Sequence, residues 1–434
     1  MKSTIKSSTS FDVTSQTIAV LGAGIIGVNC ALALQQLGYQ VTLIDKQGIG
    51  SGCSKGNAGH FATEQVFPLA DPSLLKQMPK MLMDPLGPVS LSAKHMFKAL
   101  PWFMQFFNNM RASKRAKNTT ALKALNRNAI DYYKPILQTA NASHLLVSNG
   151  SLLVFEKTTY DGVAAMYQQY LQAGIAVKLL SREQALALEP NLHDNITYAL
   201  YFTDVAHTGD PLAICAALAE YAKSLGMVYK QLAVNNVEQC GKKVVINSQS
   251  APLMFDHCVV ATGAWSKLLL NDLGYRLPIE AERGYSLNLP MNKNELALLS
   301  RPVASAERKF IITPMTKILR LSGTVEYAGL HAKANNKRAD MLVKNANCVL
   351  KQLPEQVVSG NRENNERWMG PRPSLPDSLP VICKAPVHNK IFFALGHQHL
   401  GLTQGAITGK LISQLVSGQR TDIDVSPFCI SRFN

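Results

Sequence analysis

The sequence predicts an α/β protein in which a domain built on a parallel sheet is interleaved with an α+β second domain built on a mixed sheet. Three observations predict this fold class. A strand, a glycine-rich loop and a helix open the chain within residues 18–45, and similar strand and helix segments return in its middle and at its end. The length of 434 residues also exceeds one ordinary core, and 47% hydrophobic with 17% charged residues is a globular composition.

The glycine-rich loop has the spacing of a dinucleotide site. An apolar strand at 18–21 precedes Gly22, Gly24 and Gly27, which fall at G-x-G-x-x-G. The first glycine permits a tight turn, the second lets a pyrophosphate approach the backbone, and the third lets the helix pack closely on the strand. The helix is expected from near Ile25 to about Leu37, with Gly38 as its C-cap and its N-terminal N–H groups facing the phosphates.

The strand after this helix, residues 41–44, ends in Asp45. A carboxylate about 20 residues after the glycines accepts hydrogen bonds from ribose hydroxyls and disfavours a 2′-phosphate. The first unit is therefore expected to be Rossmann-like and to bind NAD or FAD.

Later segments of the same character set the expected domain layout. The further elements are a helix opened by Asp210-Pro211 and closed by Gly226, strands at 227–234, 257–260 and 391–395, a hairpin of 234–238 and 244–247 with its turn at 241–243, and a helix at 405–417 capped by Gly418. The layout assigns 1–16 to a disordered tail, 17–80, 200–270 and 380–425 to the nucleotide-binding domain, and 81–199 and 271–379 to the second, substrate domain.

This layout favours FAD over NAD. A long ligand that is contacted by three separate segments fits FAD better, because an NAD dehydrogenase of this size usually has one uninterrupted nucleotide domain. A flavin also carries the redox chemistry itself, so no second nucleotide loop is needed.

Several segments, together with the glycine loop and Asp45, resemble the D-amino-acid oxidase superfamily of FAD-dependent enzymes. They are SKGNAGHFATEQVFPLADP (54–72), ATGAW (261–265), WMGPRPSLPDSLPVI (368–382) and GHQHLGLTQ (396–404). Over nearly the whole chain after the tail, the sequence is most similar to the small subunit of bacterial FAD-dependent D-amino-acid dehydrogenases, including the D-hydroxyproline dehydrogenase type. Pro371 and Gln398 depart from the commoner residues, which leaves the substrate open.

The resemblance implies that a D-amino acid, or a D-proline or D-hydroxyproline type of substrate, is oxidised by hydride transfer to flavin N5. Electrons would pass to a quinone or another respiratory carrier. Two alternatives stay open on the same fold, an O₂-using oxidase of the glycine or sarcosine type and a flavoprotein that modifies tRNA. A non-enzymatic flavin-binding protein is disfavoured, because Arg372 and the flavin loop would then have no purpose.

The residues expected to hold FAD noncovalently combine the glycine motif with the positions that the resemblance implies. They are Gly22, Gly24, Ile25, Ile26, Gly27, Asp45, Lys46, Asn57, Ala58, Gly59, Val234, Thr262, Gly263, Gly396, Gly401, Leu402 and Thr403. Gly405 and Gly409 lie four apart in the last helix, where glycine is costly, so close helix packing is expected.

The expected catalytic and substrate-binding residues are Arg372, Tyr285, His397 and His399. Arginine clamps a carboxylate with two parallel hydrogen bonds, and WMGPRP resembles the family segment whose arginine does this. Tyr285 is a candidate for the pocket wall or equally for an ordinary core position, as is Phe310. The two histidines form H-x-H without a third ligand at a supporting interval, so the sequence favours a place in the active-site wall and predicts no metal.

The net charge of +15 permits nucleic acid, anionic lipid or an acidic substrate as partner. No acid occurs between residues 85 and 130, where eight bases accompany an aromatic cluster. The bases are Lys94, Lys98, Arg111, Lys114, Arg115, Lys117, Lys123 and Arg127, and the cluster is Met96, Phe97, Trp102, Phe103, Phe106 and Phe107. This segment is either a membrane-surface patch or a helical cover on the second domain, and both interpretations stay open.

The sequence predicts a cytoplasmic protein that can associate peripherally with the inner face of the cell membrane. Residues 1–16 lack the apolar core of a signal peptide, and no run approaches the ~18 apolar residues of a membrane span. Eight cysteines without a C-x-x-C pair fit reduced thiols in the cytosol.

Overall fold

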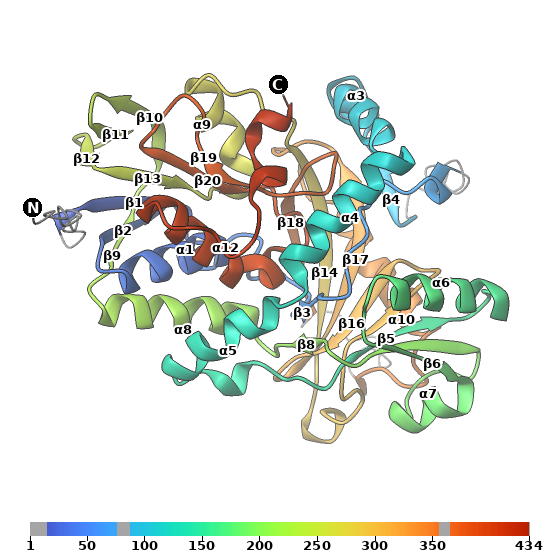
Figure 1. Cartoon of the computed structure of the whole chain (residues 1–434). Helices are drawn as coiled ribbons and strands as arrows, with labels where there is room; N and C mark the ends of the chain where they lie inside the picture. The colour runs from blue at the N-terminus through green and yellow to red at the C-terminus, as the bar shows by residue number, and fades with distance from the viewer. Residues whose placement is uncertain (1–14, 76–86, 356–364, 434) are drawn as a thin grey trace, which may run out of the picture.

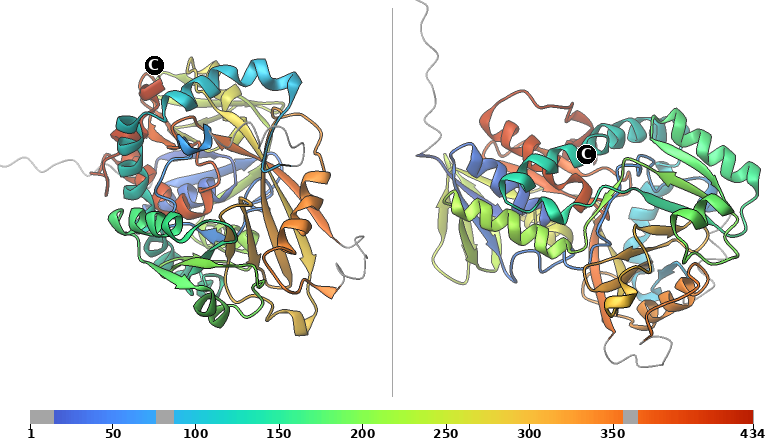
Figure 2. Two further views of the ribbon diagram at one scale, coloured as in Figure 1. Left: turned by 90° about the vertical axis from the view of Figure 1, so that its right-hand side faces the viewer. Right: turned by 90° about the horizontal axis from the view of Figure 1, so that it is seen from below.

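The computed structural model describes residues 15–75, 87–355 and 365–433. The predicted disordered tail, 1–16, therefore lies almost entirely outside the described residues. Two large sheets lie at opposite sides of the molecule, and the chain passes between them several times (Figures 1 and 2). The mixed α/β architecture is the predicted fold class.

The first sheet is parallel except at one edge, and its strand order is β19-β20-β13-β1-β2-β9. The parallel strands are β1 (Thr17–Leu21), β2 (Gln40–Asp45), β9 (Val228–Gln231), β13 (His257–Val260) and β20 (Ile391–Leu395), and β19 (Val381–Lys384) is the antiparallel edge. These strands come from the start, the middle and the end of the chain, as predicted. The predicted domain boundaries themselves stay a prediction.

Helices cover one face of the parallel sheet and a small antiparallel sheet covers the other. The helices are α1 (Ile25–Gln36), α5 (Ala129–Thr139), α8 (Pro211–Ser224) and α12 (Gly401–Ser417). The small sheet is β10 (Val234–Cys240), β11 (Lys243–Ser248) and β12 (Leu253–Phe255), with α9 (Ser266–Asp272) beside it. The predicted hairpin is thus confirmed with a third strand added, while the predicted strand 227–234 is interrupted at residues 232–233.

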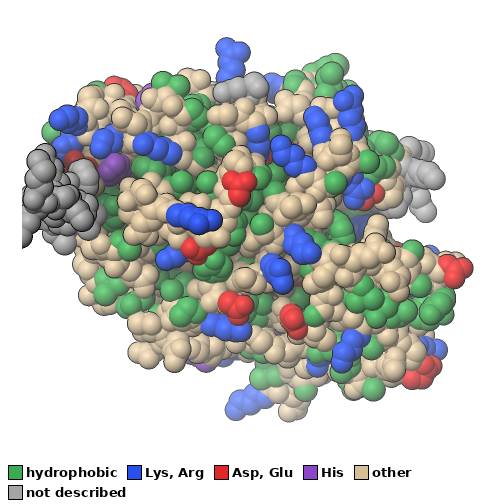
Figure 3. Space-filling view, viewed as in Figure 1, with side chains coloured by type: hydrophobic (Ala, Val, Ile, Leu, Met, Phe, Trp, Pro, Cys, Tyr) green, Lys and Arg blue, Asp and Glu red, His purple; other side chains and the backbone are tan. Residues whose placement is uncertain are grey.

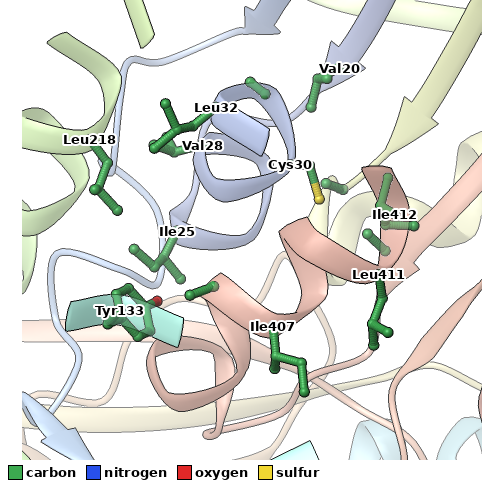
Figure 4. Close-up of a cluster of buried hydrophobic side chains, with 14 of the residues drawn as sticks. Val20, Ile25, Val28, Cys30, Leu32, Tyr133, Leu218, Ile407, Leu411 and Ile412 are labelled. Atoms are coloured by element: carbon green, nitrogen blue, oxygen red, sulfur yellow. The ribbon is translucent and has the colours of Figure 1, made fainter. Parts of the chain in front are cut away.

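Helices α1 and α12 pack closely, with apolar side chains of both in one cluster (Figure 4). A Cβ atom at Gly405 would lie 2.3 Å from the Tyr133 hydroxyl, and one at Gly409 would lie 2.5 Å from the Asn29 carbonyl oxygen. The expected reason for these two glycines is therefore confirmed. The helix itself begins at Gly401, four residues earlier than predicted, because tertiary packing outweighs the low helix propensity of the loop sequence.

The second sheet has nine strands in the order β18-β14-β17-β16-β15-β5-β7-β6, with β4 beside β17. They are β4 (Val89–Leu91), β5 (Ser151–Phe155), β6 (Val177–Ser181), β7 (Tyr198–Phe202), β14 (Glu280–Pro290), β15 (Val303–Ser305), β16 (Phe310–Pro314), β17 (Ile318–Tyr327) and β18 (Glu366–Ser374). The helices associated with it are α3 (Ala93–Asn108), α6 (Tyr160–Gln172), α7 (Arg182–Leu188) and α10 (Lys337–Ala346), whereas α4 (Ala112–Asn126) packs against α12. Between the two large sheets, β3 (His60–Phe61) pairs with β8 (Ala206–His207).

Candidate active site

A cavity of about 310 Å³ opens at the carboxyl ends of the parallel strands, where open α/β sheets bind their ligands. The ends of four strands and the N-termini of α1 and α12 line it. The predicted residues in its lining are Gly22, Gly24, Ile25, Ile26, Asp45, Lys46, Asn57, Val234, Thr262, Gly263, His397, Gly396, Gly401 and Leu402. Segments separated by more than 350 positions in the chain thus meet here, as a ligand that touches three segments requires.

The glycine loop is shaped by steric limits on two of its residues. Gly22 has φ +98°, and a Cβ there would lie 2.4 Å from the carbonyl oxygen of Ala261. A Cβ at Gly27 would lie 1.7 Å from the Gly22 carbonyl oxygen, so Gly27 supports the turn and does not itself line the cavity. The first turn of α1 leaves N–H groups without intrahelical partners, and that of Ile25 donates to Ser54 Oγ at 3.0 Å.

Asp45 lies at the cavity end of β2 and holds the turns around it. Its Oδ2 accepts the Ala23 N–H at 2.8 Å, and its Oδ1 accepts the Gln47 N–H at 2.7 Å. Beside it, the Lys46 ammonium lies 4.7 Å from the centre of the Trp265 ring, and both residues line the cavity. The carboxylate is therefore fixed at the place where a ribose is expected.

The other end of the cavity is formed by the loop before α12. His397 lines the cavity, and its Nε2 lies 3.0 Å from Thr408 Oγ1. Burial lowers the pKa of His397 to about 3, so its ring is neutral near pH 7. Thr403 lies in the first turn of α12, where its Oγ1 accepts the Ala62 N–H at 2.9 Å. Thr403 therefore ties two segments together outside the cavity lining, unlike Gly401 and Leu402.

The loop at 55–59 is held by a buried arginine that the sequence analysis missed. Arg320 donates from Nη1 to the carbonyl oxygens of Lys55 (3.0 Å) and Asn57 (2.7 Å). Asn57 lines the cavity, whereas Ala58 and Gly59 do not; a Cβ at Gly59 would lie 2.5 Å from the Thr208 carbonyl oxygen. The one sequence signal for Arg320 was a charge within an otherwise apolar strand, ILRLSG.

Arg372 lies on β18 and faces Glu282 on β14, its direct cross-strand neighbour. Arg372 Nη1 is 3.3 Å from Glu282 Oε1. The guanidinium group lies over Gly284, where a Cβ would be 2.4 Å from its Cζ. The position adjoins the cavity, because Pro373 is in the lining, and so is Cys53, whose thiol donates to the Pro371 carbonyl at 2.9 Å.

His399 is near this charged pair. Burial lowers its pKa to about 4, with Glu282 acting to raise the pKa and Arg372 to lower it. The two histidines of H-x-H therefore have different surroundings, one in the cavity lining beside α12 and the other beside the second sheet.

Tyr285 is not brought to the cavity. Side chains alternate along β14, so Tyr285 lies on the opposite face from Glu282, in the apolar core beneath α10. Its hydroxyl donates to Glu326 Oε2 at 2.6 Å and accepts the Asn335 N–H at 3.0 Å. Phe310 belongs to the same core. The core interpretation, and not the pocket-wall one, describes both residues.

Comparison with known proteins assigns the chain to a family. A family model described as FAD dependent oxidoreductase matches residues 17–415. The chain belongs to this family of FAD-dependent oxidoreductases. Similar curated proteins include a D-amino-acid oxidase of Bradyrhizobium diazoefficiens (32% identical over 96% of this chain and 98% of that protein) and a D-amino acid dehydrogenase of Vibrio vulnificus (28% identical over 93% and 96%).

Solved structures share the fold of this FAD-dependent oxidoreductase. The L-proline dehydrogenase from P. horikoshii superposes with a TM-score of 0.72 at 17% identity, covering 96% of this chain and 97% of that chain. The glycine oxidase from Geobacillus kaustophilus superposes with a TM-score of 0.70 at 21% identity, covering 96% and 99%. These likenesses confirm the predicted fold class.

The cavity of this FAD-dependent oxidoreductase suits its cofactor. Two helix N-termini meet at one cavity and can donate N–H groups to anionic or carbonyl oxygens of the ligand. Gly24, Gly263 and Gly401 leave backbone without side chains in the lining, and a Cβ at Gly263 would meet nothing within 4 Å. Glycine backbone, a fixed carboxylate and apolar walls match the hydrogen-bonding groups and the shape of a flavin dinucleotide.

FAD should be released intact when the purified protein is denatured with acid. The thiol of Cys53 and the imidazole of His397, both in the described lining, are poor candidates for a flavin bond. Burial raises the pKa of Cys53 to about 12, although Arg372 acts to lower it, so the thiol stays protonated, and His397 is hydrogen-bonded to Thr408. Absorbance of the supernatant after precipitation checks this; yellow colour that stays in the pellet would contradict it.

Proposed function

We propose that the protein oxidises the Cα–N bond of a D-amino acid, or of a cyclic D-proline or D-hydroxyproline type of substrate, and passes the electrons to a quinone or another carrier. The observation that carries the proposal is the Arg372 guanidinium beside the cofactor cavity. Among the described residues, Glu282 is its one hydrogen-bonding partner, which leaves donors for a substrate carboxylate. When bound, FAD supplies the two-electron acceptor, taking a hydride from the substrate Cα at flavin N5.

The residues of the chain bind and orient the substrate in this proposal. Arg372 binds the carboxylate with a two-pronged pair of hydrogen bonds, which fixes the Cα–H bond relative to the cavity. Arg320 holds the loop at Asn57, and the N-terminus of α12 presents its positive dipole end to the cavity. His399 is neutral near pH 7 and adds no charge beside the guanidinium.

The choice of D-amino acids as substrate class is supported by the names of the two curated relatives and by the motif resemblance. Dye-linked turnover of the purified holoenzyme over D- and L-amino acids, with D-proline and D-hydroxyproline included, tests it. We expect D-enantiomers to be oxidised faster than their L-forms. Turnover restricted to L-amino acids, or none of either series, would refute the substrate class.

The electron acceptor is tested separately, because one relative is named an oxidase and the other a dehydrogenase. After substrate reduction in the absence of air, the bleached flavin should be reoxidised faster by a soluble quinone analogue than by O₂. Stopped-flow absorbance measures both rates. Faster reoxidation by O₂ would instead support the oxidase alternative.

The surface of α3 supports a membrane-bound carrier as acceptor. Large apolar side chains at helical spacing are exposed on it, with Phe97 79% and Met104 63% exposed, and Met96, Leu100 and Phe107 beside them. The opposite side of the helix covers the second sheet, where Trp102 is buried and donates to the Ser374 carbonyl at 3.2 Å. The helical-cover interpretation therefore describes one side of this helix, and the exposed apolar side is what supports the membrane-surface interpretation.

Exposed bases accompany this apolar face. They are Lys94, Lys98, Arg111, Lys114, Lys117 and Arg127, and several Lys and Arg side chains lie beside hydrophobic ones over the region of α3 and α4 (Figure 3). We propose that α3 and α4 bind an anionic membrane surface. Within the described ranges, helices that are long and apolar enough to cross a bilayer are absent.

The protein should co-sediment with anionic vesicles, and less so as salt rises, because each basic side chain near the charged surface contributes about 1 kcal/mol that salt screens. The double variant Phe97→Ser/Met104→Ser should bind several-fold more weakly. Met254→Ser, which removes an equally exposed (69%) apolar side chain on β12, serves as the matched control. Equal binding to neutral and anionic vesicles, or none to either, would contradict the surface assignment.

A further inference from the structure

Glu282 is a buried carboxylate with one oxygen satisfied and one not. Its side chain is 4% exposed, and Oε1 lies 3.3 Å from Arg372 Nη1. Oε2 is buried and has no hydrogen-bond partner among the described residues. A buried charged oxygen without a partner is costly, so an unpaired one in a native site indicates a missing partner.

Glu280 lies on the same face of the same strand, and its carboxylate has hydrogen-bond partners. Its Oε1 lies 2.8 Å from His95 Nε2 and accepts the Ala281 N–H at 3.1 Å. Glu280 is therefore tied to α3 and to its own backbone. Of these two carboxylates, Glu282 is the one paired with the arginine that adjoins the cavity.

The groups around Glu282 compete little with a ligand for its carboxylate. Glu282 is paired with Arg372 and acts electrostatically on His399 and Tyr327. Both of these are neutral near pH 7, because burial lowers the pKa of the histidine and raises that of the tyrosine. The Arg372–Glu282 contact is a single hydrogen bond, so a ligand can bind both side chains without displacing a bidentate pair.

We propose that Glu282 binds the amino group of the substrate while Arg372 binds its carboxylate. The proposal rests on the proposed function, since it needs a substrate in which the two groups are attached to one carbon. A cation and an anion side by side on adjacent strands match such a dipolar molecule. Glu282 is then a specificity-determining residue that selects amino acids over carboxylic acids that lack the amine.

The test uses two non-reactive ligands of the holoenzyme, 2-aminobenzoate and benzoate, whose binding is followed by the change in flavin absorbance. Both carry the carboxylate, and only the first carries an adjacent amino group. The wild type should bind 2-aminobenzoate more tightly than benzoate. In Glu282→Gln the dissociation constant of 2-aminobenzoate should rise about tenfold, the cost of a hydrogen bond to a charged group, while that of benzoate should stay constant or fall.

The control variant Glu280→Gln, on the same strand and face, should leave both dissociation constants unchanged. Equal weakening of both ligands in Glu282→Gln would mean that Glu282 only holds Arg372 in place, and would overturn the proposal. So would a wild type without preference for 2-aminobenzoate. Arg372→Ala tests the proposed function separately. Unchanged benzoate binding in that variant would show that Arg372 does not bind the carboxylate, and the Glu282→Gln result could still be interpreted by itself.

Discussion

Replacing Arg372 by alanine is expected to lower kcat/KM for the best amino acid about 30- to 1,000-fold, while FAD content stays near normal. The loss corresponds to roughly 2–4 kcal/mol for removing a charged hydrogen-bonding partner inside a partly dry site. The guanidinium lies over Gly284, outside the glycine loop and helix N-termini that line the cofactor cavity, so FAD retention should not depend on it. Steady-state kinetics and the flavin-to-protein absorbance ratio measure the two effects.

Two further variants make this result specific. Arg372→Lys keeps the charge and loses the planar, two-pronged geometry, so it should recover only part of the activity. Arg367→Ala removes another arginine of β18, whose Nε lies 2.6 Å from Asp340 Oδ1, and should change kcat/KM little. An Arg372→Ala enzyme with full kcat/KM and normal FAD would show that another group holds the carboxylate.

Replacing Asp45 by alanine is expected to raise the dissociation constant of FAD about 10- to 150-fold. The variant loses a charged acceptor for the ribose hydroxyls, worth on the order of 1.5–3 kcal/mol. It also loses the hydrogen bonds to the Ala23 and Gln47 N–H groups that shape the cavity edge. Titration of apoprotein with FAD, followed by quenching of flavin fluorescence, measures the change.

Asp45→Asn is the matched variant, because it keeps an oxygen acceptor at the same place and removes only the charge. It should lie between the wild type and Asp45→Ala. Urea unfolding of each apoprotein separates weaker FAD binding from general destabilisation. A dissociation constant for FAD that is the same in all three proteins would refute the ribose assignment.

The sequence by itself determined the features that depend on local chemistry. Positive φ at Gly22 and Gly38, the apolar strand before them and the acid after the next strand are properties of a few neighbouring residues. The first βαβ unit therefore appears where it was predicted, with α1 ending one residue before Leu37. Close packing at Gly405 and Gly409 was also predictable, because glycine inside a helix needs a steric reason.

Only the tertiary structure decided which side chains share the proposed substrate site. Glu282 and Arg372 are 90 positions apart, and strand register sets them opposite each other while alternation turns Tyr285 into the core. The roles of Arg320 and of the two sides of α3 likewise depend on segments that meet only after folding. Sequence patterns with periods of two or 3.6 residues show that an element has two faces. Which face meets the cofactor cavity depends on long-range pairing, which no local pattern contains.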